Sequence, residues 1–594
     1  MWQPSLGAWV TTDGVRFRVW APEIAAVDLV VESGAGTGTH RLTREGNDTD
    51  GFHTLMLAGV ADGDRYRYRL DGGPGLPDPA SRYQPEGVHG PSQVVDPSRF
   101  RWLDEEWCPP TLHDLIIYEV HVGTFSPSGR FDGVTERLPL LAQLGVTAIE
   151  LMPVADFSGG RGWGYDGVDL FAPSRAYGAP DDLRRLVDTA HRLGLAVLLD
   201  VVYNHLGPDG AYLGAFSPYY FTTKHESPWG AGVNLDGEHS AAVRAFFIEN
   251  ARHWLHEYHI DGLRLDATHA LADDSPRHFL AELTDVLHAE KPSAILVAED
   301  SRNLRTMIMP TADGGWGLDG VWADDFHHQV RRRLAGDDDG YYRDYTGRLE
   351  DLARTIDDGW LYRGQHSVHA GGPRGTDPTG LPRRRFVVCL QNHDQIGNRA
   401  FGDRLSADIE APAFRAASAL LLCLPETPLM FMGQEWNATS PFLYFTDHHE
   451  ELGTLVTDGR RNEFRHFARF ADPDAATRIP DPQAKSTFED SRLRWDERAR
   501  EPHAGMLRLY QALIALRRQE PALRGEECRT IALDDQTLLM WRGWSERRPL
   551  AILVRFGTAG QVTIDRTRRP GAAGHRRWRP RITTEDPDFA QDPR

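Results

Sequence analysis

The sequence predicts an α/β protein, a (β/α)8 TIM barrel with an N-terminal β-sandwich domain and a small C-terminal β-domain. Eight apolar segments, most of them separated by helix-forming sequence, lie between residues 114 and 436. The first 105 residues contain short alternating runs instead, and two β-like runs follow the last long helix. Because 594 residues exceed one ordinary domain, we expect domains at 1–105, 106–522 and 523–594.

The N-terminal segment alternates apolar or aromatic side chains with arginine. The runs VRFRVWAP (15–22) and YRYRL (66–70) place these two kinds of side chain on opposite faces of a strand. Gly, Asp and Pro separate such runs, and no long helical period appears. A small β-sandwich is therefore expected.

The barrel strands are expected in eight continuous apolar runs. These are residues 114–123, 145–154, 194–205, 260–267, 293–300, 318–326, 385–394 and 427–436. Continuous apolar runs are typical of strands that are buried on both faces, as in an all-parallel sheet. Helical patterns precede several of them, for example the helix that Pro180 opens. Eight strand and helix units predict a closed barrel.

After the barrel, residues 505–519 form the last expected helix. The runs QTLLMWRG (536–543) and PLAILVRFG (549–557) are typical of strands and predict the C-terminal β-domain. The tail from about Arg566 is rich in Arg and Pro without a pattern, so it is assigned no structure.

The composition excludes some classes of partner. A net charge of −20 argues against nucleic acid or an anionic membrane, although an acidic surface can also serve solubility alone. The four cysteines are scattered without a CxxC pair, which suits a reducing cytoplasm. No signal peptide is visible and no apolar run reaches the roughly 20 residues of a membrane span, so a cytoplasmic protein is expected.

Acidic residues and histidines gather where the expected strands end. Chemistry in such a barrel lies at the C-terminal ends of its strands. In chain order these ends carry His121, Asp200 to His205, Asp266, Glu299, Asp324 and Asp325, Asp394, and Glu435. If these were only solvated loop charges, about half of them should be Lys or Arg. Arg264 is the one basic residue among them. The pattern indicates an acidic cleft.

Arg264 and Asp266 lie two residues apart, which puts both side chains on one face of a strand. The guanidinium would keep Asp266 ionised. A structural salt bridge is the simpler interpretation of this pair taken alone.

Three carboxylates around a cleft fit glycoside hydrolysis. Asp266 suits an ionised group that attacks the anomeric carbon, and Glu299, at the end of an apolar strand, suits a protonated acid. Asp394, next to His393, could grip sugar hydroxyls. Trp163 and Tyr165 could pack against sugar rings, or could only pack the loop against the barrel.

Four segments resemble a known family. DVVYNH, GLRLDATH, VAED and QNHDQIGN, in this order, resemble the conserved segments of the α-amylase superfamily (glycoside hydrolase family 13). The resemblance implies the barrel and a retaining mechanism. It implies Asp266 as nucleophile, Glu299 as general acid/base and Asp394 as transition-state stabiliser. It also implies substrate-binding residues at Tyr165, His205, Arg264, His393, Gln395 and Asn398.

WGYDGVDLFAPSRAYGAPDDL, VVYNHLGPDGAYL and VWADDFHHQVRRRLAG are among the segments that extend the resemblance over residues 1–450. In them the sequence is similar to the trehalose-releasing branch of the superfamily, whose members also carry an N-terminal, carbohydrate-binding-like β-sandwich. This implies hydrolysis of the α-1,4 bond next to a terminal trehalose, and a functional partner in the enzyme that makes this trehalose linkage. Polar groups beyond the cleavage point would have to bind the second glucose unit of the trehalose. The candidates are Asp324, Asp325, His327 and His328, with His269 just after Asp266; a solvated loop or a helix N-terminus is the alternative.

Neither a metal nor a cofactor is expected. Family members often bind calcium through the residue at Asn204, but no DxDxDG-like loop is present. The alternatives within the superfamily are a glycogen-branching or debranching enzyme, which would share the three carboxylates. The non-enzyme alternative is an inactive α-glucan-binding protein.

Overall fold

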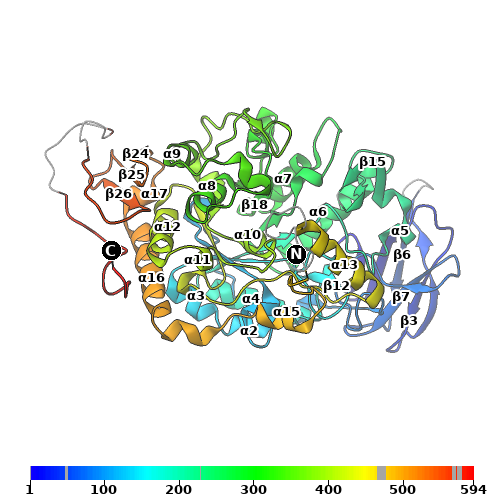
Figure 1. Cartoon of the computed structure of the whole chain (residues 1–594). Coiled ribbons are helices and arrows are strands. Elements are labelled where there is room, and N and C mark those ends of the chain that lie inside the picture. The colour runs from blue at the N-terminus through cyan, green and yellow to red at the C-terminus, as the bar shows by residue number, and fades with distance from the viewer. Residues whose placement is uncertain are drawn as a thin grey trace.

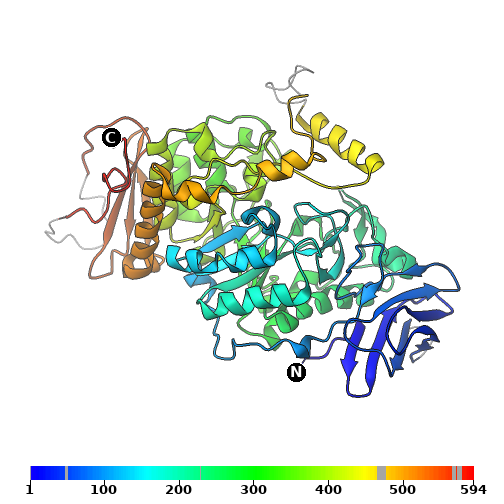
Figure 2. The ribbon, with the colours of Figure 1, turned by 90° about the horizontal axis from the view of Figure 1, so that it is seen from below.

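The computed structural model describes residues 2–46, 51–227, 229–464, 477–564, 570 and 578–593. Figure 1 shows an elongated molecule with the barrel in the middle, the N-terminal sheets at one end and the C-terminal sheet at the other. The view from below in Figure 2 shows the same order. Within the described residues, every helix is too short or too polar to cross a membrane.

Eight parallel strands close into a barrel, which confirms the predicted fold class and each of the eight strands. They follow one another in chain order around the barrel, and the last pairs with the first. The strands are β10 (Ile117–Val120), β11 (Ala148–Leu151), β14 (Ala196–Val201), β17 (Gly262–Leu265), β18 (Ile295–Ala298), β19 (Gly320–Trp322), β22 (Phe386–Cys389) and β23 (Thr427–Phe431).

Helices cover the barrel on the outside. They are α3 (Leu138–Leu144), α4 (Pro180–Arg192), α6 (Ser240–Glu257), α7 (Phe279–Glu290), α8 (Asp325–Leu334), α9 (Leu349–Asp358), α12 (Ala411–Cys423) and α16 (His503–Gln519). Proline at the first position begins α4, whose apolar stripe is buried against the barrel. Between β18 and β19 the connection contains the 3₁₀ helices η5 (Arg305–Met307) and η6 (Thr311–Asp313), and no α-helix.

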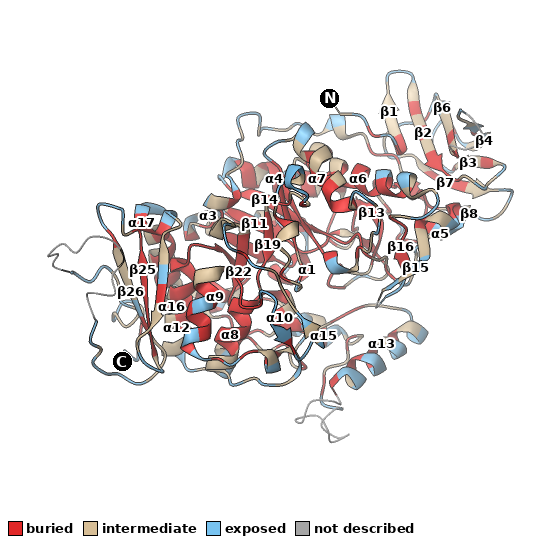
Figure 3. Cartoon of the chain, turned by 90° about the horizontal axis from the view of Figure 1, so that it is seen from above, coloured by how far each residue is buried: buried red, intermediate tan, exposed pale blue. Residues whose placement is uncertain are grey.

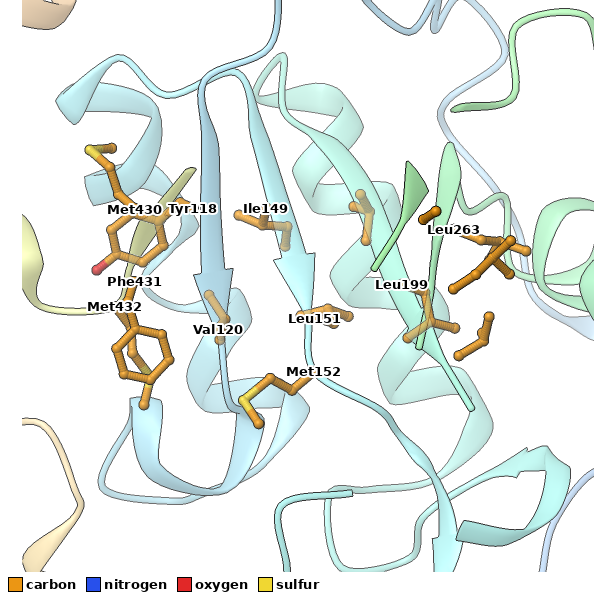
Figure 4. Close-up of a cluster of buried hydrophobic side chains, with 14 of the residues drawn as sticks. Tyr118, Val120, Ile149, Leu151, Met152, Leu199, Leu263, Met430, Phe431 and Met432 are labelled. Carbon is orange, nitrogen blue, oxygen red and sulfur yellow. The ribbon is translucent and has the colours of Figure 1, made fainter. Parts of the chain in front are cut away.

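The two faces of each barrel strand carry different residues. Alternate positions point out to the helices, and Figure 4 shows several of these, among them Val120, Leu151 and Leu263. The residues between them point into the barrel, where Ile117, Leu198 and Val297 form a separate apolar cluster. The same alternation places charged side chains in the interior near the C-terminal strand ends. These are Glu119, Glu150, Asp200, Arg264 and Asp266.

The N-terminal segment forms two antiparallel sheets, which confirms the predicted sandwich. One sheet contains β1 (Gly7–Thr11), β2 (Gly14–Trp20), β6 (Phe52–Leu57) and β5 (Thr43–Arg44). The other contains β4 (Gly38–Arg41), β3 (Val27–Val31), β7 (Arg65–Leu70) and β8 (Gly75–Leu76), with β9 (Ser92–Gln93) on β7. Phe17, Tyr66 and Tyr68 are buried in one cluster between them, as the alternating runs predict.

The C-terminal sheet has one strand more than expected. The two expected runs are β25 (Thr537–Arg542) and β26 (Leu550–Arg555), and β24 (Cys528–Ala532) adds a third strand on β25. Residues 566–569 and 571–577 of the tail lie outside the described residues. Residues 578–593 contain neither helix nor strand, but Ala590 is buried and Glu585 and Asp592 pair with Arg415 of α12.

Long connections cover the C-terminal end of the barrel. The hairpin β15 (Phe221–Ser227) and β16 (Gly230–Val233), the short helix α10 (His393–Gly397) and helix α13 (Glu450–Glu463) lie in these connections. Figure 3 shows that the barrel strands are buried whereas much of α13 is exposed.

Candidate active site

Arg264 is the centre of the charged group in the barrel. Its side chain is fully buried on β17, and its Nη1 donates to Asp200 Oδ2 at 2.7 Å and to Asp266 Oδ1 at 2.8 Å. Its Nη2 lies 3.6 Å from Glu299 Oε2 and 3.8 Å from Asp394 Oδ2. One guanidinium therefore faces all three predicted catalytic carboxylates.

Asp266 stands at the end of β17 and reaches the solvent, with 11% of its side chain exposed. Beside the bond from Arg264, its Oδ2 accepts a hydrogen bond from Asn204 Nδ2 at 2.7 Å. The same amide donates to the Asp266 backbone carbonyl, also at 2.7 Å. Two donors thus hold the carboxylate in one orientation.

The backbone after Asp266 joins the ends of β17 and β18. Ala267 adopts a left-handed conformation (φ 41°), which is unusual for a residue with a side chain. In this conformation its N–H donates to Glu299 Oε2, and the next N–H, of Thr268, donates to the Glu299 carbonyl at 3.0 Å. The turn therefore ties the predicted nucleophile to the predicted acid.

Glu299 keeps its proton more easily than an ordinary carboxyl group does. Burial raises its pKa to about 8, and the charges of Asp266 and Asp394 act in the same direction, while Arg264 and the Ala267 N–H oppose them. A carboxylic acid with such a pKa can give a proton near neutral pH.

Asp394 has the opposite character. Burial opposes its charge, but His393, Arg264 and Asn398 outweigh burial and lower its pKa to about 2. His393 Nε2 lies 3.3 Å from its Oδ1, and Asn398 Nδ2 donates to the same oxygen at 3.3 Å. The site thus places an acid that keeps its proton near a carboxylate that stays charged.

The two aromatic candidates have different positions. The Tyr165 hydroxyl bonds Asp200 Oδ2 at 2.6 Å and His393 Nε2 at 2.7 Å, and its ring is half-buried beside the carboxylates. Trp163 is buried, stacks on Phe442 and donates to the Leu443 carbonyl at 2.8 Å. Tyr165 is therefore in place to touch a sugar, while Trp163 packs the loop against its neighbours.

The histidines of the first and fourth segments, His205 and His393, are held by protein groups. His205 contacts Asn204 Oδ1 through Nδ1 and the Tyr165 carbonyl through Nε2 at 3.0 Å. Its ring stacks on the exposed ring of Trp229 at the tip of the β15–β16 hairpin, 4.4 Å between centroids. His393 is buried, between Glu119 on one side and Tyr165 and Asp394 on the other.

The segment at the start of α8 divides into one open and three buried side chains. Asp324 is half-buried, and burial, with the charges of Asp394 and Asp325, raises its pKa to about 6. Asp325 is fully buried and accepts hydrogen bonds from Asn303, Tyr345, Arg374 and two backbone N–H groups. Asp324 is thus the member that a ligand can reach.

His327 and His328 lie behind Asp324. His327 is buried and bonds the Leu390 carbonyl and the Tyr342 hydroxyl. His328 is buried among the rings of Tyr341, Tyr342 and Tyr345, and burial lowers its pKa well below its ordinary value. Both histidines support the wall of the site from within.

The remaining candidates lie at the rim. His269 is exposed, three residues after Asp266. Asn398 is exposed beside Asp394, and Gln395 is mostly buried with its Oε1 3.4 Å from the Tyr341 hydroxyl.

Glu119 belongs to the same network through its bonds to His393, and Glu150 lies beside Glu119. Neither was predicted as a site residue. Both are 1% exposed and lie opposite each other in the register of β10 and β11. The available signal was a lone carboxylate in the middle of each apolar strand, as in IYEV and AIEL. Burial, with the nearby charges of Glu119 and Asp200, raises the pKa of Glu150 well above its ordinary value.

Asn204 does not fit the role of a calcium ligand. Its Nδ2 is committed to Asp266 and its Oδ1 faces His205 Nδ1. Both side-chain atoms therefore serve the site itself.

Comparisons with known proteins agree with this geometry. Residues 93–225 match the family model "Alpha amylase, catalytic domain", and residues 5–85 match "Carbohydrate-binding module 48 (Isoamylase N-terminal domain)". The malto-oligosyltrehalose trehalohydrolase of Deinococcus radiodurans is 46% identical over 89% of this chain and 85% of that protein.

Two further proteins are also similar to this chain. A crystal structure from Salmonella typhimurium, described as an alpha amylase, superimposes with a TM-score of 0.86 at 38% identity and covers 94% of both chains. A 1,4-alpha-glucan branching enzyme of Corynebacterium jeikeium is 29% identical over 73% of this chain and 62% of that protein. The trehalohydrolase therefore resembles this chain over a larger share of both sequences than the branching enzyme does.

Proposed function

This chain belongs to the malto-oligosyltrehalose trehalohydrolase family of the α-amylase superfamily, and on that premise we propose that it releases trehalose from malto-oligosyltrehalose. The reaction is hydrolysis of the α-1,4-glucosidic bond next to the terminal trehalose. It proceeds by two displacements, with retention of configuration at the freed glucan end.

The residue roles are part of this proposal. Asp266 attacks the anomeric carbon of the glucan residue while Glu299 protonates the leaving oxygen of trehalose. Water, deprotonated by Glu299, then releases the glucan from Asp266. Asp394 and the Arg264 guanidinium bind the sugar and stabilise the charge that develops on it.

One observation carries the assignment of roles. Glu299 and Asp394 lie 3.6 and 3.8 Å from the same nitrogen of Arg264, Nη2, yet the pKa of Glu299 is about 8 and that of Asp394 about 2. Carboxyl groups whose pKa values are driven apart mark the acid and the charged groups of a glycosidase site. The backbone link through Ala267 holds Asp266 close to Glu299, as a retaining mechanism requires.

Asp324 supports the choice of leaving group. It is a partly exposed carboxyl group near Asp394, and the buried side chains of Asp325, His327 and His328 anchor the start of α8, which follows it. We assign it to hydroxyl groups beyond the cleavage point, where trehalose would lie. His269, Gln395 and Asn398 complete this polar rim.

The proposal extends to the cellular setting. The substrate must come from an enzyme that makes the terminal trehalose linkage, which is the expected functional partner. All four cysteines are unpaired, so we keep the cytoplasm as the expected compartment. The domain boundaries at residues 105/106 and 522/523 also stay predictions.

The test is a comparison of products. The enzyme is incubated with malto-oligosyltrehalose, maltopentaose and amylose, and the products are separated by chromatography. We expect trehalose from the first substrate only. Branched products from amylose would favour the branching enzyme instead.

Stereochemistry tests the mechanism separately. Proton NMR in the first minutes should show the α-anomer of the glucan product before mutarotation. Early β-anomer would mean inversion and a wrong assignment of both Asp266 and Glu299. Retention without trehalose would contradict only the choice of substrate.

A further inference from the structure

Glu119 lies inside the barrel on β10, and its carboxylate contacts both the backbone N–H and the ring Nδ1 of His393. Its Oε2 accepts from the His393 backbone N–H at 2.9 Å, and its Oε1 contacts His393 Nδ1. The side chain of Glu119 is 1% exposed, so water does not compete for these bonds. The carboxylate therefore fixes both the peptide group and the ring of His393.

The other ring nitrogen points toward the reacting centre. His393 Nε2 lies 3.3 Å from Asp394 Oδ1 and 2.7 Å from the Tyr165 hydroxyl. That hydroxyl also bonds Asp200 Oδ2. Because each ring nitrogen faces a carboxylate, which only accepts hydrogen bonds, both interactions are satisfied together when the ring is an imidazolium.

The surroundings favour this charge. Burial opposes it, but Asp394 and Glu119 outweigh burial and raise the pKa of His393 well above its ordinary value. Further titratable groups near the ring are Glu150 on β11, Asp200 on β14 and Tyr165. The cation nearby is Arg264, which pairs with Asp200 and Asp266. His121 also lies near, but burial lowers its pKa to about 4, so it is neutral near neutral pH. The indole rings of Trp163 and Trp322 enclose the imidazole and exclude water.

We propose that Glu119 is a positioning residue of the reaction: it holds His393 as an imidazolium, and this cation keeps Asp394 charged and oriented toward the sugar. The chain of three groups, Glu119, His393 and Asp394, runs from the middle of the barrel to the cleft. This inference rests on the proposed function, because Asp394 acts on a sugar only in that reaction.

Glu119→Gln tests the inference, with Glu150→Gln as the matched control. Glu150 is equally buried, lies opposite Glu119 in the register and has no hydrogen bond to His393 among the described residues. Since burial raises the pKa of Glu150 well above its ordinary value, its neutral form is favoured, and glutamine is a neutral replacement of nearly the same shape.

We expect kcat/KM of Glu119→Gln to fall on the order of 10- to 100-fold, because a fixed charge at the site is lost. The alkaline limb of its pH profile should move to lower pH, because His393 then loses its proton within the working range. The profile of Glu150→Gln should match that of the wild type.

Histidine NMR gives a readout that needs no substrate. With ¹³C-labelled histidine, and a His393→Gln sample to assign the signal, His393 should stay protonated in the wild type and titrate at lower pH in Glu119→Gln. Loss of activity with an unmoved pH limb and an unmoved His393 titration would reduce Glu119 to a packing role and overturn the inference.

Glu119→Asp covers the case in which the glutamine variant does not fold. It keeps the charge, so its alkaline limb should stay at the wild-type position while its rate falls. If the alkaline limb of Glu119→Asp moved to lower pH as far as that of Glu119→Gln, the result would contradict the inference. If the wild type released no trehalose, the proposed function would fail, whereas the NMR titration would still decide whether Glu119 sets the charge of His393.

Discussion

At the residue scale, Arg264 shows how charges are tolerated at the end of an apolar strand. An unpaired guanidinium in a barrel core would be costly. Arg264 is fully buried but bonded to Asp200 and Asp266, and its ring neighbour Trp322 lies 4.3 Å from the guanidinium carbon. The two-residue spacing of Arg264 and Asp266 predicted their contact. The spacing could not predict the left-handed Ala267, because a backbone turn of this kind leaves no mark on residue type.

Asp266→Asn should lower kcat by roughly 10³-fold or more, because it removes the attacking carboxylate. The fold should survive, since Arg264 keeps its bond to Asp200. Steady-state kinetics and circular dichroism of the purified variant measure the two effects. A variant with more than a tenth of wild-type activity would remove Asp266 from the role of nucleophile.

The protonation of Glu299 should set the alkaline limb of the pH profile. The acid must carry its proton to serve the leaving group, and its pKa is about 8. Activity on malto-oligosyltrehalose should therefore hold below this pH and fall as the pH rises through it. The measurement is kcat/KM against pH at constant ionic strength.

Glu299→Gln serves as the control for that assignment. Its loss of rate should be large on malto-oligosyltrehalose and smaller on substrates with good leaving groups, which need no proton. Its profile should also lack the alkaline limb of the wild type. Equal losses on both kinds of substrate would argue that Glu299 is not the acid.

At the scale of elements, hydrophobic pattern was enough to predict the eight barrel strands, since continuous apolar runs of this length are typical of strands that are buried on both faces. It was not enough for β24, whose sequence CRTIA is short and half-exposed and depends on pairing with β25. Nor could the pattern show that 3₁₀ turns replace a helix between β18 and β19. Which connection forms there depends on how it packs against the outside of the barrel.

Gly262 in β17 is a position where the barrel needs the absence of a side chain. A Cβ there would lie 2.3 Å from the Ile295 carbonyl oxygen and 2.8 Å from Leu198 Cδ2. Gly262→Ala should therefore lower the free energy of unfolding by about 1–3 kcal/mol through overpacking.

Gly459 in helix α13 is the matched contrast. A Cβ there would meet nothing within 4 Å, so Gly459→Ala should raise the free energy of unfolding by about 0.5–1 kcal/mol. Thermal unfolding of both variants checks the opposite signs; a stable Gly262→Ala would show that the strands β14 and β18 can move apart.

At the scale of the whole molecule, the order of domains could be predicted from the change in sequence period along the chain. The network below the cleft could not, because Glu119, Asp200 and His393 are far apart in the sequence and meet only when the barrel closes. The acidic strand ends indicated where the site lies, and the family resemblance supplied the roles of its residues. Neither indicated which carboxylates point inward below the rim.

The C-terminal tail is the clearest case of structure without a sequence pattern. Residues 578–593 lie along α12 and α16, and Figure 1 places the C-terminus beside α16. Arg415 of α12 bonds Glu585 and Asp592, each at 2.9 Å, and its side chain is only 6% exposed. Arg508 of α16 donates to the Asp588 carbonyl at 2.7 Å. The tail therefore covers the outer face of two barrel helices, away from the cleft.

Arg415→Gln should consequently lower the stability of the molecule on the order of 1–3 kcal/mol, because it leaves two carboxylates without their cation. Arg529→Gln is the matched control: Arg529 is largely exposed and lies 3.7 Å from Asp357, so its loss should change stability by less than about 0.5 kcal/mol. Deletion of residues 578–594 should act like Arg415→Gln or more strongly, since it also exposes the surface under Ala590. In all three variants kcat/KM should match the wild type, because none of these contacts reaches Arg264 or the carboxylates around it. A deletion that melts like the wild type would show that the tail adds nothing to the fold, and a deletion that loses activity without loss of stability would connect the tail to the cleft.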